Sequence, residues 1–277
     1  VGEAVGVVEV PQVAVEQAVK QVQKCDYSDE YIIAQVSSPF SKLYVKETDE
    51  VTGVEGRHRF LQFSIGGYQG GMNLSHPTKL VFSYTRVMIE IMNMYRPDSQ
   101  RVFMIGHGIG TMTGQISSLG KTIEVAEIDE KVLEVSHMYF GYKGNEVEIG
   151  DGRILLGNKS NYTYDVMLLD AYSGGSVPYH LTTEQFFDLT IRKLTFKGIL
   201  MMNIVGNTIK DRYVESLYGT VAKVYPYVKV YTADPNLSPF AVQNLIFVAS
   251  QVELNSVSLQ EGKEVLIQRG KVISETE

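Results

Sequence analysis

An aspartate follows a run of apolar residues near the middle of the chain. Asp170 comes directly after Tyr164-Asp-Val-Met-Leu-Leu, so we expect it to leave the core at the carboxyl end of a buried strand. Free primary amines have a pKa of about 10.4, so an amine must lose a proton before it can act as a nucleophile. A partly buried carboxylate beside a bound cation can take that proton. We therefore predict Asp170 as a general base, the alternative being an aspartate that caps the following loop.

Three glycines follow an earlier apolar run, Val102 to Ile105. Gly106, Gly108 and Gly110 allow a tight turn and a close approach of the backbone to a ligand at the start of a helix. The dinucleotide-binding pattern has its last glycine where this chain has Thr111, which disfavours a nicotinamide or flavin cofactor. A tight strand-to-helix turn without any ligand is the alternative.

Two further strand ends carry acids. One ends in Glu127-Ile128-Asp129, where a carboxylate can accept both hydroxyls of a ribose. The next ends in Gly150-Asp151-Gly152, where the acid can accept a hydrogen bond from an adenine amino group. Alternatively, Glu127 is a solvated acid and Asp151 a helix N-cap. Because ligands bind at the carboxyl edge of open α/β sheets, we predict a nucleoside site that includes Glu127, Ile128, Asp151 and Gly152.

The elements that position these residues alternate along the chain. Three short β-prone runs, at residues 31–36, 42–46 and 60–65, predict a small antiparallel sheet. Apolar residues at helical spacing follow Pro77 and continue from Leu80 to Tyr95, after which strand and helix patterns alternate, including a helix opened by Thr182. The pattern predicts an α/β fold, with a Rossmann-like, doubly wound sheet and a small N-terminal antiparallel β-domain. We divide the chain into an arm (1–30), the β-domain (31–76), the nucleoside-binding catalytic domain (77–253) and a tail (254–277).

Composition narrows the function classes. The formal charge is -7 and the pI about 5.4, so no general attraction to nucleic acid or to anionic lipid is expected. Apolar runs fall short of the ~20 residues that cross a bilayer, so we expect no membrane contact from this chain. The only cysteine, Cys25, excludes an internal disulfide and a cysteine-based metal site, and it favours a cytoplasmic location.

In order and spacing, these residues resemble the spermidine synthase family. The resemblance also includes Gln69, Tyr84, and Leu169-Asp170 followed by Pro178 and Leu181, and it runs from about Ser38 to Ser250. It implies that the larger sheet is of the S-adenosylmethionine-methyltransferase type. It also implies a homodimer that transfers an aminopropyl group from decarboxylated S-adenosylmethionine to a small-molecule amine, without a metal. It also implies that Gln69 and Tyr84 line the reaction centre and that Tyr172 and Ser173 lie beside the substrate.

Two departures from the family pattern bear on the substrates. Ile109 stands where the family has an acid for the aminopropyl ammonium, and Ser173 where it has an acid for the diamine. An unpaired buried ammonium is costly, so the ordinary acceptor putrescine is disfavoured. Two alternatives stay open: a methyltransferase that uses intact S-adenosylmethionine, and a catalytically silent nucleoside-binding domain.

Overall fold

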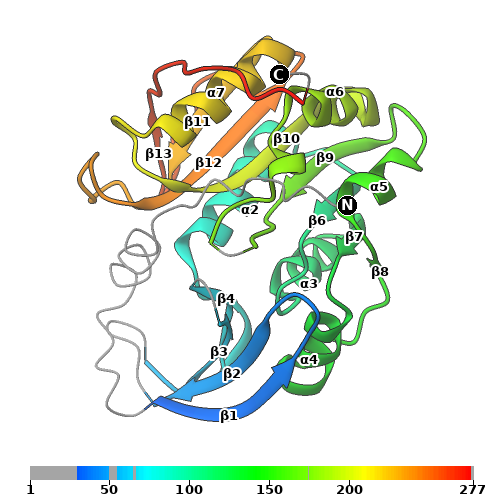
Figure 1. Ribbon diagram of the computed structural model, residues 1–277, viewed down its shortest axis with the longest axis vertical. Coiled ribbons are helices and arrows are strands. Elements are labelled where there is room, and N and C mark those ends of the chain that lie inside the picture. The colour runs from blue at the N-terminus through cyan, green and yellow to red at the C-terminus, as the bar shows by residue number, and fades with distance from the viewer. Residues whose placement is uncertain (1–29, 50–54, 65–66, 174, 276–277) are drawn as a thin grey trace, which may run out of the picture.

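The structure is a computed structural model that describes residues 30–49, 55–64, 67–173 and 175–275. It contains two β-sheets, a smaller N-terminal one in blue and cyan and a larger one made by the rest of the chain (Figure 1). The arm predicted over residues 1–30 lies, except for its last residue, outside the described residues.

The smaller sheet is antiparallel, with the strands in chain order from edge to edge. The strands are β1 (Glu30–Ser37), β2 (Lys42–Thr48), β3 (His58–Phe63), β4 (Tyr68–Asn73) and β5 (His76–Leu80). The predicted small antiparallel sheet is therefore confirmed, but the prediction that a helix follows directly after Pro77 is wrong. Leu80 ends β5 opposite Met72, and the helix starts only at Ser83. Leu80 fits the helical spacing because, from its strand, it packs into the same apolar cluster as the helix.

The larger sheet has the order β13-β11-β12-β10-β9-β6-β7-β8. The pairs from β10 to β8 are parallel, whereas β10, β12, β11 and β13 pair antiparallel at the other side. This arrangement confirms the predicted α/β sheet and shows that one side of it is antiparallel. The strands are β6 (Arg101–Ile105), β7 (Thr122–Glu127), β8 (Val147–Ile149), β9 (Tyr164–Leu169), β10 (Leu194–Gly206), β11 (Tyr227–Thr232), β12 (Gln243–Ser250) and β13 (Lys263–Val265).

Helices cover both faces of the larger sheet. Along β9, Met167 and Leu169 join one apolar core, while Val166 and Leu168 join the core on the opposite face. Successive side chains of β9 point to opposite faces of the sheet, and both faces are covered by an apolar core. This explains why the sequence of β9 is continuously apolar. The helices are α2 (Ser83–Tyr95), α3 (Thr111–Ser118), α4 (Glu130–Phe140), α5 (Gly152–Gly157), α6 (Glu184–Lys193), α7 (Arg212–Val224) and the 3₁₀ turn η2 (Tyr179–Leu181).

One sequence-based assignment in the C-terminal half is wrong. The N-cap of α6 is Thr183 and not Thr182: the Thr183 hydroxyl accepts from the Phe186 N–H, whereas the Thr182 hydroxyl donates to the Tyr179 carbonyl. The segment beyond residue 253, for which no element was predicted, forms β13 and then runs back over α6 and α7. There the Glu184 N–H donates to the Ile273 carbonyl at 2.9 Å.

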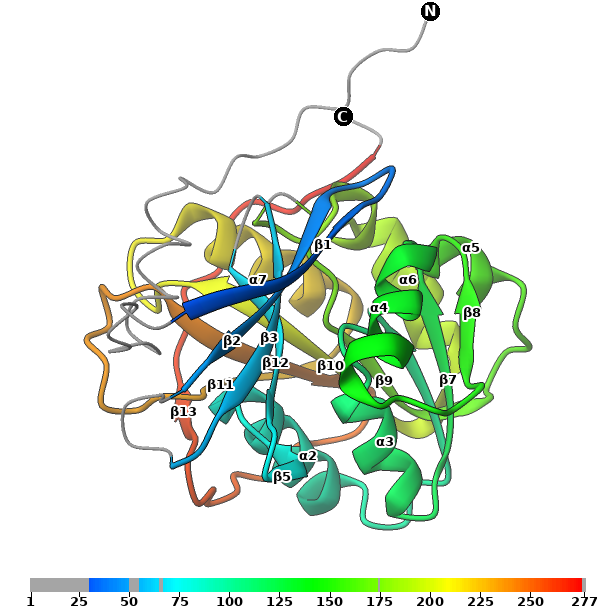
Figure 2. The ribbon, with the colours of Figure 1, turned by 90° about the horizontal axis from the view of Figure 1, so that it is seen from below.

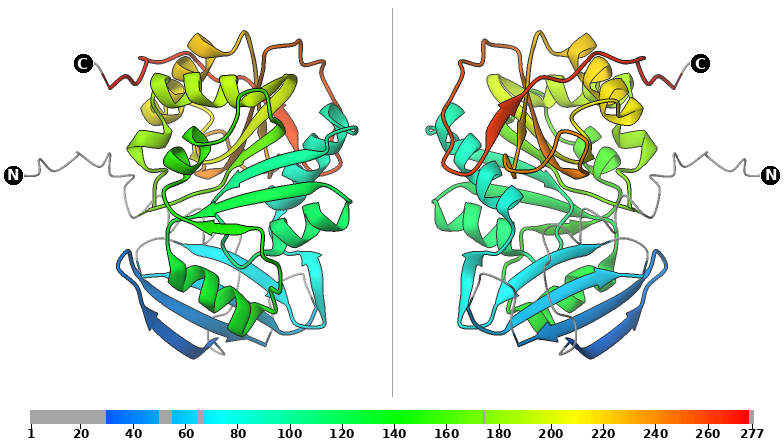
Figure 3. Two further views of the ribbon diagram at one scale, coloured as in Figure 1. Left: turned by 90° about the vertical axis from the view of Figure 1, so that its right-hand side faces the viewer. Right: turned by 90° about the vertical axis from the view of Figure 1, so that its left-hand side faces the viewer.

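A third apolar cluster joins the two sheets. Leu43 and Leu61 of the smaller sheet pack with Val132 and Val135 of α4 and with Ile109 from the turn after β6. Figures 2 and 3 show α4 lying beside the blue strands of the N-terminal sheet. The glycine turn after β6, where a nucleoside site was predicted, is thus held in place between the two sheets. No helix among the described residues is both long and apolar enough to span a bilayer.

Candidate active site

A cavity of about 1120 Å³ lies at the carboxyl ends of the parallel strands, facing the smaller sheet. Eleven of the twelve site residues predicted from the sequence line it, and the twelfth, Gly110, does not. The eleven are Gln69, Tyr84, Gly106, Gly108, Glu127, Ile128, Asp151, Gly152, Asp170, Tyr172 and Ser173.

The glycine turn between β6 and α3 needs its glycines for backbone geometry. Gly106, Gly108 and Gly110 have φ values of 97°, 57° and 86°, which L side chains rarely adopt. A Cβ atom on Gly106 would also lie 2.1 Å from the Asp170 carbonyl oxygen. Gly110 instead serves as the N-cap of α3, packed against Tyr142. The turn therefore brings backbone from β6 directly against the end of β9.

His107 in this turn is a buried residue that sequence reasoning did not single out. Its Nε2 lies 2.9 Å from the Ser136 hydroxyl, and its Nδ1 lies 3.4 Å from that of Thr113. Burial lowers its pKa to about 4, with a smaller contribution from His137. The imidazole is therefore neutral at physiological pH and braces the turn against α3 and α4.

Glu127 ends β7 with its carboxylate held by backbone. Its Oε2 accepts from the His107 N–H at 2.9 Å, and its Oε1 accepts from the Asp129 N–H at 3.0 Å. Burial raises the pKa of Glu127, and these backbone N–H groups oppose the rise. Each oxygen keeps a lone pair for a ligand hydroxyl. The neighbouring Ile128 is 46% exposed and lines the same end of the cavity.

Asp151 is engaged within the protein. Its Oδ1 caps α5 by accepting from the N–H groups of Arg153 and Ile154, so the helix N-cap considered as an alternative is present. Its Oδ2 lies 2.6 Å from His180 Nε2. Gly152 follows it with no room for a side chain, because a Cβ would lie 2.5 Å from Ile105. A ligand that donates a hydrogen bond to Asp151 would therefore share its carboxylate with His180.

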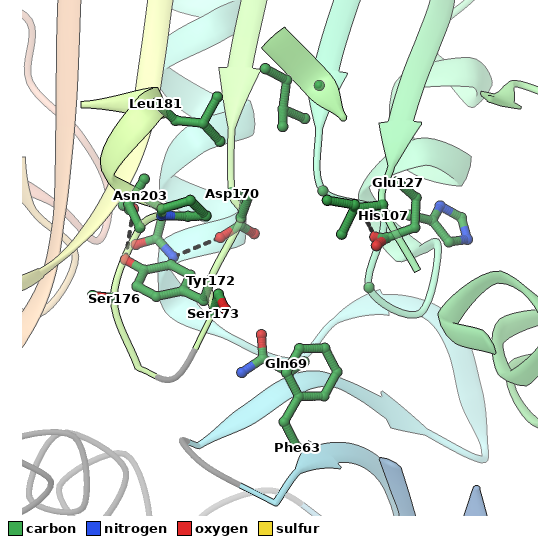
Figure 4. Close-up of a pocket in the computed structure, with 18 of the residues that line it drawn as sticks. Phe63, Gln69, His107, Glu127, Asp170, Tyr172, Ser173, Ser176, Leu181 and Asn203 are labelled. Atoms are coloured by element: carbon green, nitrogen blue, oxygen red, sulfur yellow. Dashed lines mark hydrogen bonds between the residues drawn. The ribbon is translucent and has the colours of Figure 1, made fainter. Parts of the chain in front are cut away.

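Asp170 follows β9 and faces the cavity from the side opposite Glu127 (Figure 4). Its Oδ2 accepts from the Tyr84 hydroxyl at 3.1 Å, and its Oδ1 accepts from the Asn203 side-chain amide at 2.9 Å. Burial raises the pKa of Asp170, while the hydrogen bonds from Asn203 and Tyr84 oppose the rise. The carboxylate is thus oriented by two neutral donors and not by a cation.

Two asparagines that sequence reasoning missed complete this arrangement. Asn244 of β12 donates to Oδ1 of Asn203 at 2.9 Å, and Asn203 of β10 donates to Asp170. The hydrogen bond from Asn244 fixes which end of the Asn203 side-chain amide faces Asp170. A polar residue in the apolar run Gly198 to Val205 was the available signal, since a buried amide in a central strand needs a partner.

Tyr172 and Ser173 follow Asp170 in the loop that borders the cavity. The Tyr172 hydroxyl donates to the Asn203 backbone carbonyl at 2.7 Å, which holds its ring beside Asp170. Ser173 is exposed, and its backbone pairs with that of Ser176 in a narrow turn. Within the described residues, no group of three or more His, Cys, Asp and Glu side chains could share a metal ion.

The order of glycine turn, two strand-end acids and Asp170 along one cavity suits a nucleoside with a reactive group at its far end. A family model described as the spermine/spermidine synthase domain matches residues 81–261. The chain belongs to this family. The resemblance drawn from the sequence is therefore confirmed.

Comparisons with individual spermine/spermidine synthase relatives agree. A polyamine aminopropyltransferase of Vibrio vulnificus is 28% identical over 132 residues, which are 45% of this chain and 44% of that protein. The chain thus spans less than half of that relative's length. A probable spermidine synthase from Corynebacterium glutamicum superposes with a TM-score of 0.70 at 20% identity, covering 83% of this chain and 84% of that one. Human methyltransferase-like protein 13, in complex with SAH, gives a TM-score of 0.54 at 20% identity over 65% of this chain and 87% of that one.

This member of the spermine/spermidine synthase family has an apolar contact at the turn. Ile109 is 4% exposed, and a Cβ on Gly70 would lie 2.7 Å from its side chain. Gln69, which precedes Gly70, lines the cavity, and its side-chain amide donates to the Gly67 carbonyl at 3.2 Å. The position of the expected acid is therefore filled by a side chain that packs between the sheets.

Proposed function

We propose that the protein is a transferase that moves an aminopropyl group from decarboxylated S-adenosylmethionine to a small-molecule amine, with Asp170 as general base. Family membership supports the reaction class. The observation that carries the proposal is that Asp170 shares one cavity with Glu127 and the glycine turn, and is held by Tyr84 and Asn203.

In this proposal the donor nucleoside occupies the end of the cavity below β6, β7 and β8. Glu127 accepts the ribose hydroxyls, and the backbone at Gly106 and Gly108 approaches the ligand closely. Asp151 and Gly152 border the adenine, and Ile128 packs against it. Gln69 and Ile109 then flank the sulfonium and its propyl chain, which directs the reacting carbon toward Asp170.

The acceptor amine enters beside Asp170, Tyr84 and Tyr172. The carboxylate of Asp170 takes one proton from the ammonium group, which frees the nitrogen lone pair. That lone pair forms a bond to the propyl carbon on sulfur while the carbon–sulfur bond breaks, and the bonding electrons leave with methylthioadenosine. The positive charge passes from sulfur to the new secondary ammonium. The two neutral donors on Asp170 hold it in line without neutralising it.

A second candidate function is methyl transfer from intact S-adenosylmethionine. The specific observation in its favour is the buried Ile109, which gives the aminopropyl ammonium no acid at the glycine turn. Both reactions are substitutions at a carbon on a sulfonium, so the same cavity can serve either. A catalytically silent nucleoside-binding domain ranks third, because it leaves the hydrogen-bonded Asp170 without a role.

The deciding experiment compares three ligands. Thermal stabilisation by methylthioadenosine, S-adenosylmethionine and its decarboxylated form reports which nucleoside binds. Mass spectrometry of products from an amine panel then identifies the transferred group. We expect preference for the decarboxylated donor and products heavier by one aminopropyl group. Products heavier by one methylene group would establish methylation instead.

We also propose that the protein acts as a cytoplasmic homodimer, without metal, nucleic acid or membrane contact. The negative charge of the chain supports the absence of nucleic-acid binding. Light scattering during gel filtration tests the dimer. Activity that persists in the presence of a chelator supports the metal-free reaction.

A further inference from the structure

The part of the cavity around Asp170, where the acceptor amine is proposed to bind, is built mainly from neutral polar groups. We call it the acceptor side. Around Asp170 lie Tyr172, Asn203 and Asn244, all of which line the cavity and are linked by hydrogen bonds. Tyr213, at the start of α7, lines it as well. Tyr172 and Tyr213 thus both line the cavity, and the pKa of Tyr172 is raised by burial, with smaller contributions from Asp170 and Tyr213.

The other carboxylates that line the cavity lie away from this side and have partners. Asp129 caps α4, and Glu275 pairs with Arg153 and accepts from the Thr183 hydroxyl. Glu127 and Asp151 lie at the ends of β7 and β8, and Asp170 lies at the end of β9. Among the described residues that line the cavity, Asp170 is thus the one acid available to an acceptor. It can match one ammonium group.

The acceptor side also holds polar groups without partners. The Tyr213 hydroxyl is buried and has no hydrogen-bond partner among the described residues. Such a group is costly unless a ligand or water satisfies it. Asn244 lines the cavity and donates one side-chain N–H to Asn203, so its side-chain oxygen and second N–H remain for a ligand. Both side chains can donate and accept hydrogen bonds, but neither balances a positive charge.

We propose that the acceptor is a primary amine that carries a single ammonium group and, at its other end, a neutral hydrogen-bonding group such as a hydroxyl or an amide. This inference rests on the proposed function for the reacting amine at Asp170. A diamine would bring a second ammonium into a site without a counter-ion, which is costly. A hydroxyl or amide instead satisfies Tyr213 and Asn244.

Binding measurements test the inference separately from catalysis. The probes are putrescine, the amino alcohol in which a hydroxyl replaces one of its amino groups, and butylamine, each titrated calorimetrically into the complex with methylthioadenosine. We expect the amino alcohol to bind about tenfold more tightly than either of the others. Equal or tighter binding of putrescine, or no binding of any amine, overturns the inference. Binding of the amino alcohol without aminopropyl transfer leaves it standing and overturns the proposed function.

Variants locate the effect. Tyr213→Phe should remove most of the preference for the amino alcohol over butylamine, whereas Tyr218→Phe on the same helix, away from the cavity, should keep it. Ser173 is exposed at the cavity, so Ser173→Asp adds a carboxylate there without burying it. We expect Ser173→Asp to bind putrescine about tenfold more tightly than its neutral counterpart Ser173→Asn. An unchanged preference in both Tyr213→Phe and Ser173→Asp overturns the assignment.

Discussion

The side-chain amide of Asn203 donates to Oδ1 of Asp170 at 2.9 Å, and its own oxygen accepts from Asn244. The amide is therefore fixed in the one orientation that stabilises an ionised carboxylate. Because this bond opposes the rise that burial causes in the pKa of Asp170, Asn203 is expected to set the pH range in which the base is active.

Replacing Asn203 tests that relationship. In Asn203→Leu, which keeps a similar volume, loss of a hydrogen bond to a charged group should raise the pKa of Asp170 by about one unit. The base must be ionised, so the acidic limb of the profile of kcat/KM against pH should move to higher pH. Methylthioadenosine binding serves as the check on folding. An unmoved acidic limb would contradict the role of Asn203.

Asp170 itself should be required for turnover and not for nucleoside binding. Asp170→Asn keeps the shape and the contact with Tyr84 but cannot take a proton, so turnover should fall by about 10³-fold. The affinity for methylthioadenosine should stay nearly the same. Asp188→Asn, an exposed change on α6, is the matched control. Retained turnover in Asp170→Asn would refute the base assignment.

Glu127 is expected to carry nucleoside affinity. In Glu127→Gln an amide N–H₂ faces one of the two backbone N–H groups that now donate to the carboxylate, and one acceptor for the ribose is lost. We expect methylthioadenosine to bind about 10- to 100-fold more weakly, measured by calorimetry. Glu130→Gln, at an exposed position of α4, should bind normally. Equal affinities in the two variants would exclude Glu127 from the site.

The buried His107 should lower the free energy of unfolding of the protein in mild acid. Its pKa is lowered to about 4 in the folded protein, against about 6.5 in an unfolded chain, so the unfolded state binds more protons between these values. Keeping His107 neutral therefore contributes up to about 3 kcal/mol to the free energy of unfolding. This contribution is complete above pH ~6.5 and is lost as the pH falls toward ~4. Glu127 and Asp170, whose pKa values are raised, act in the opposite direction. Urea unfolding of wild type and His107→Gln across this range isolates the histidine effect, and parallel pH dependences would contradict it.

Ile109 should matter for stability. Ile109→Ala leaves a cavity between the glycine turn and the smaller sheet, which should cost about 2–4 kcal/mol. Ile154→Ala, at a 65% exposed position, removes the same atoms from a solvated site and should cost little. Thermal or denaturant unfolding measures both. Equal losses would mean that the contact of Ile109 with Gly70 contributes nothing.

The sequence predicted what local pattern and strand ends determine. Asp170 and Glu127 each follow an apolar strand, and parallel strands bring their carboxyl ends to one edge, so their convergence could be anticipated. Asn203 and Asn244 could not be paired in advance, because the neighbours of β10 depend on how β12 folds back. The contact of His180 with Asp151 likewise joins residues 29 positions apart. The assignment of Leu80 to a helix was wrong because its apolar side chain serves the same core from either structure.

The contact between Ile109 and Gly70 has a thermodynamic consequence. The glycine turn after β6, which is proposed to bind the donor, packs against the N-terminal sheet through Ile109. Unfolding of the turn or of that sheet therefore breaks the same apolar interface. Nucleoside binding should therefore reinforce the docking of that sheet, and the two layers should melt together in a single calorimetric transition that the ligand shifts as a whole.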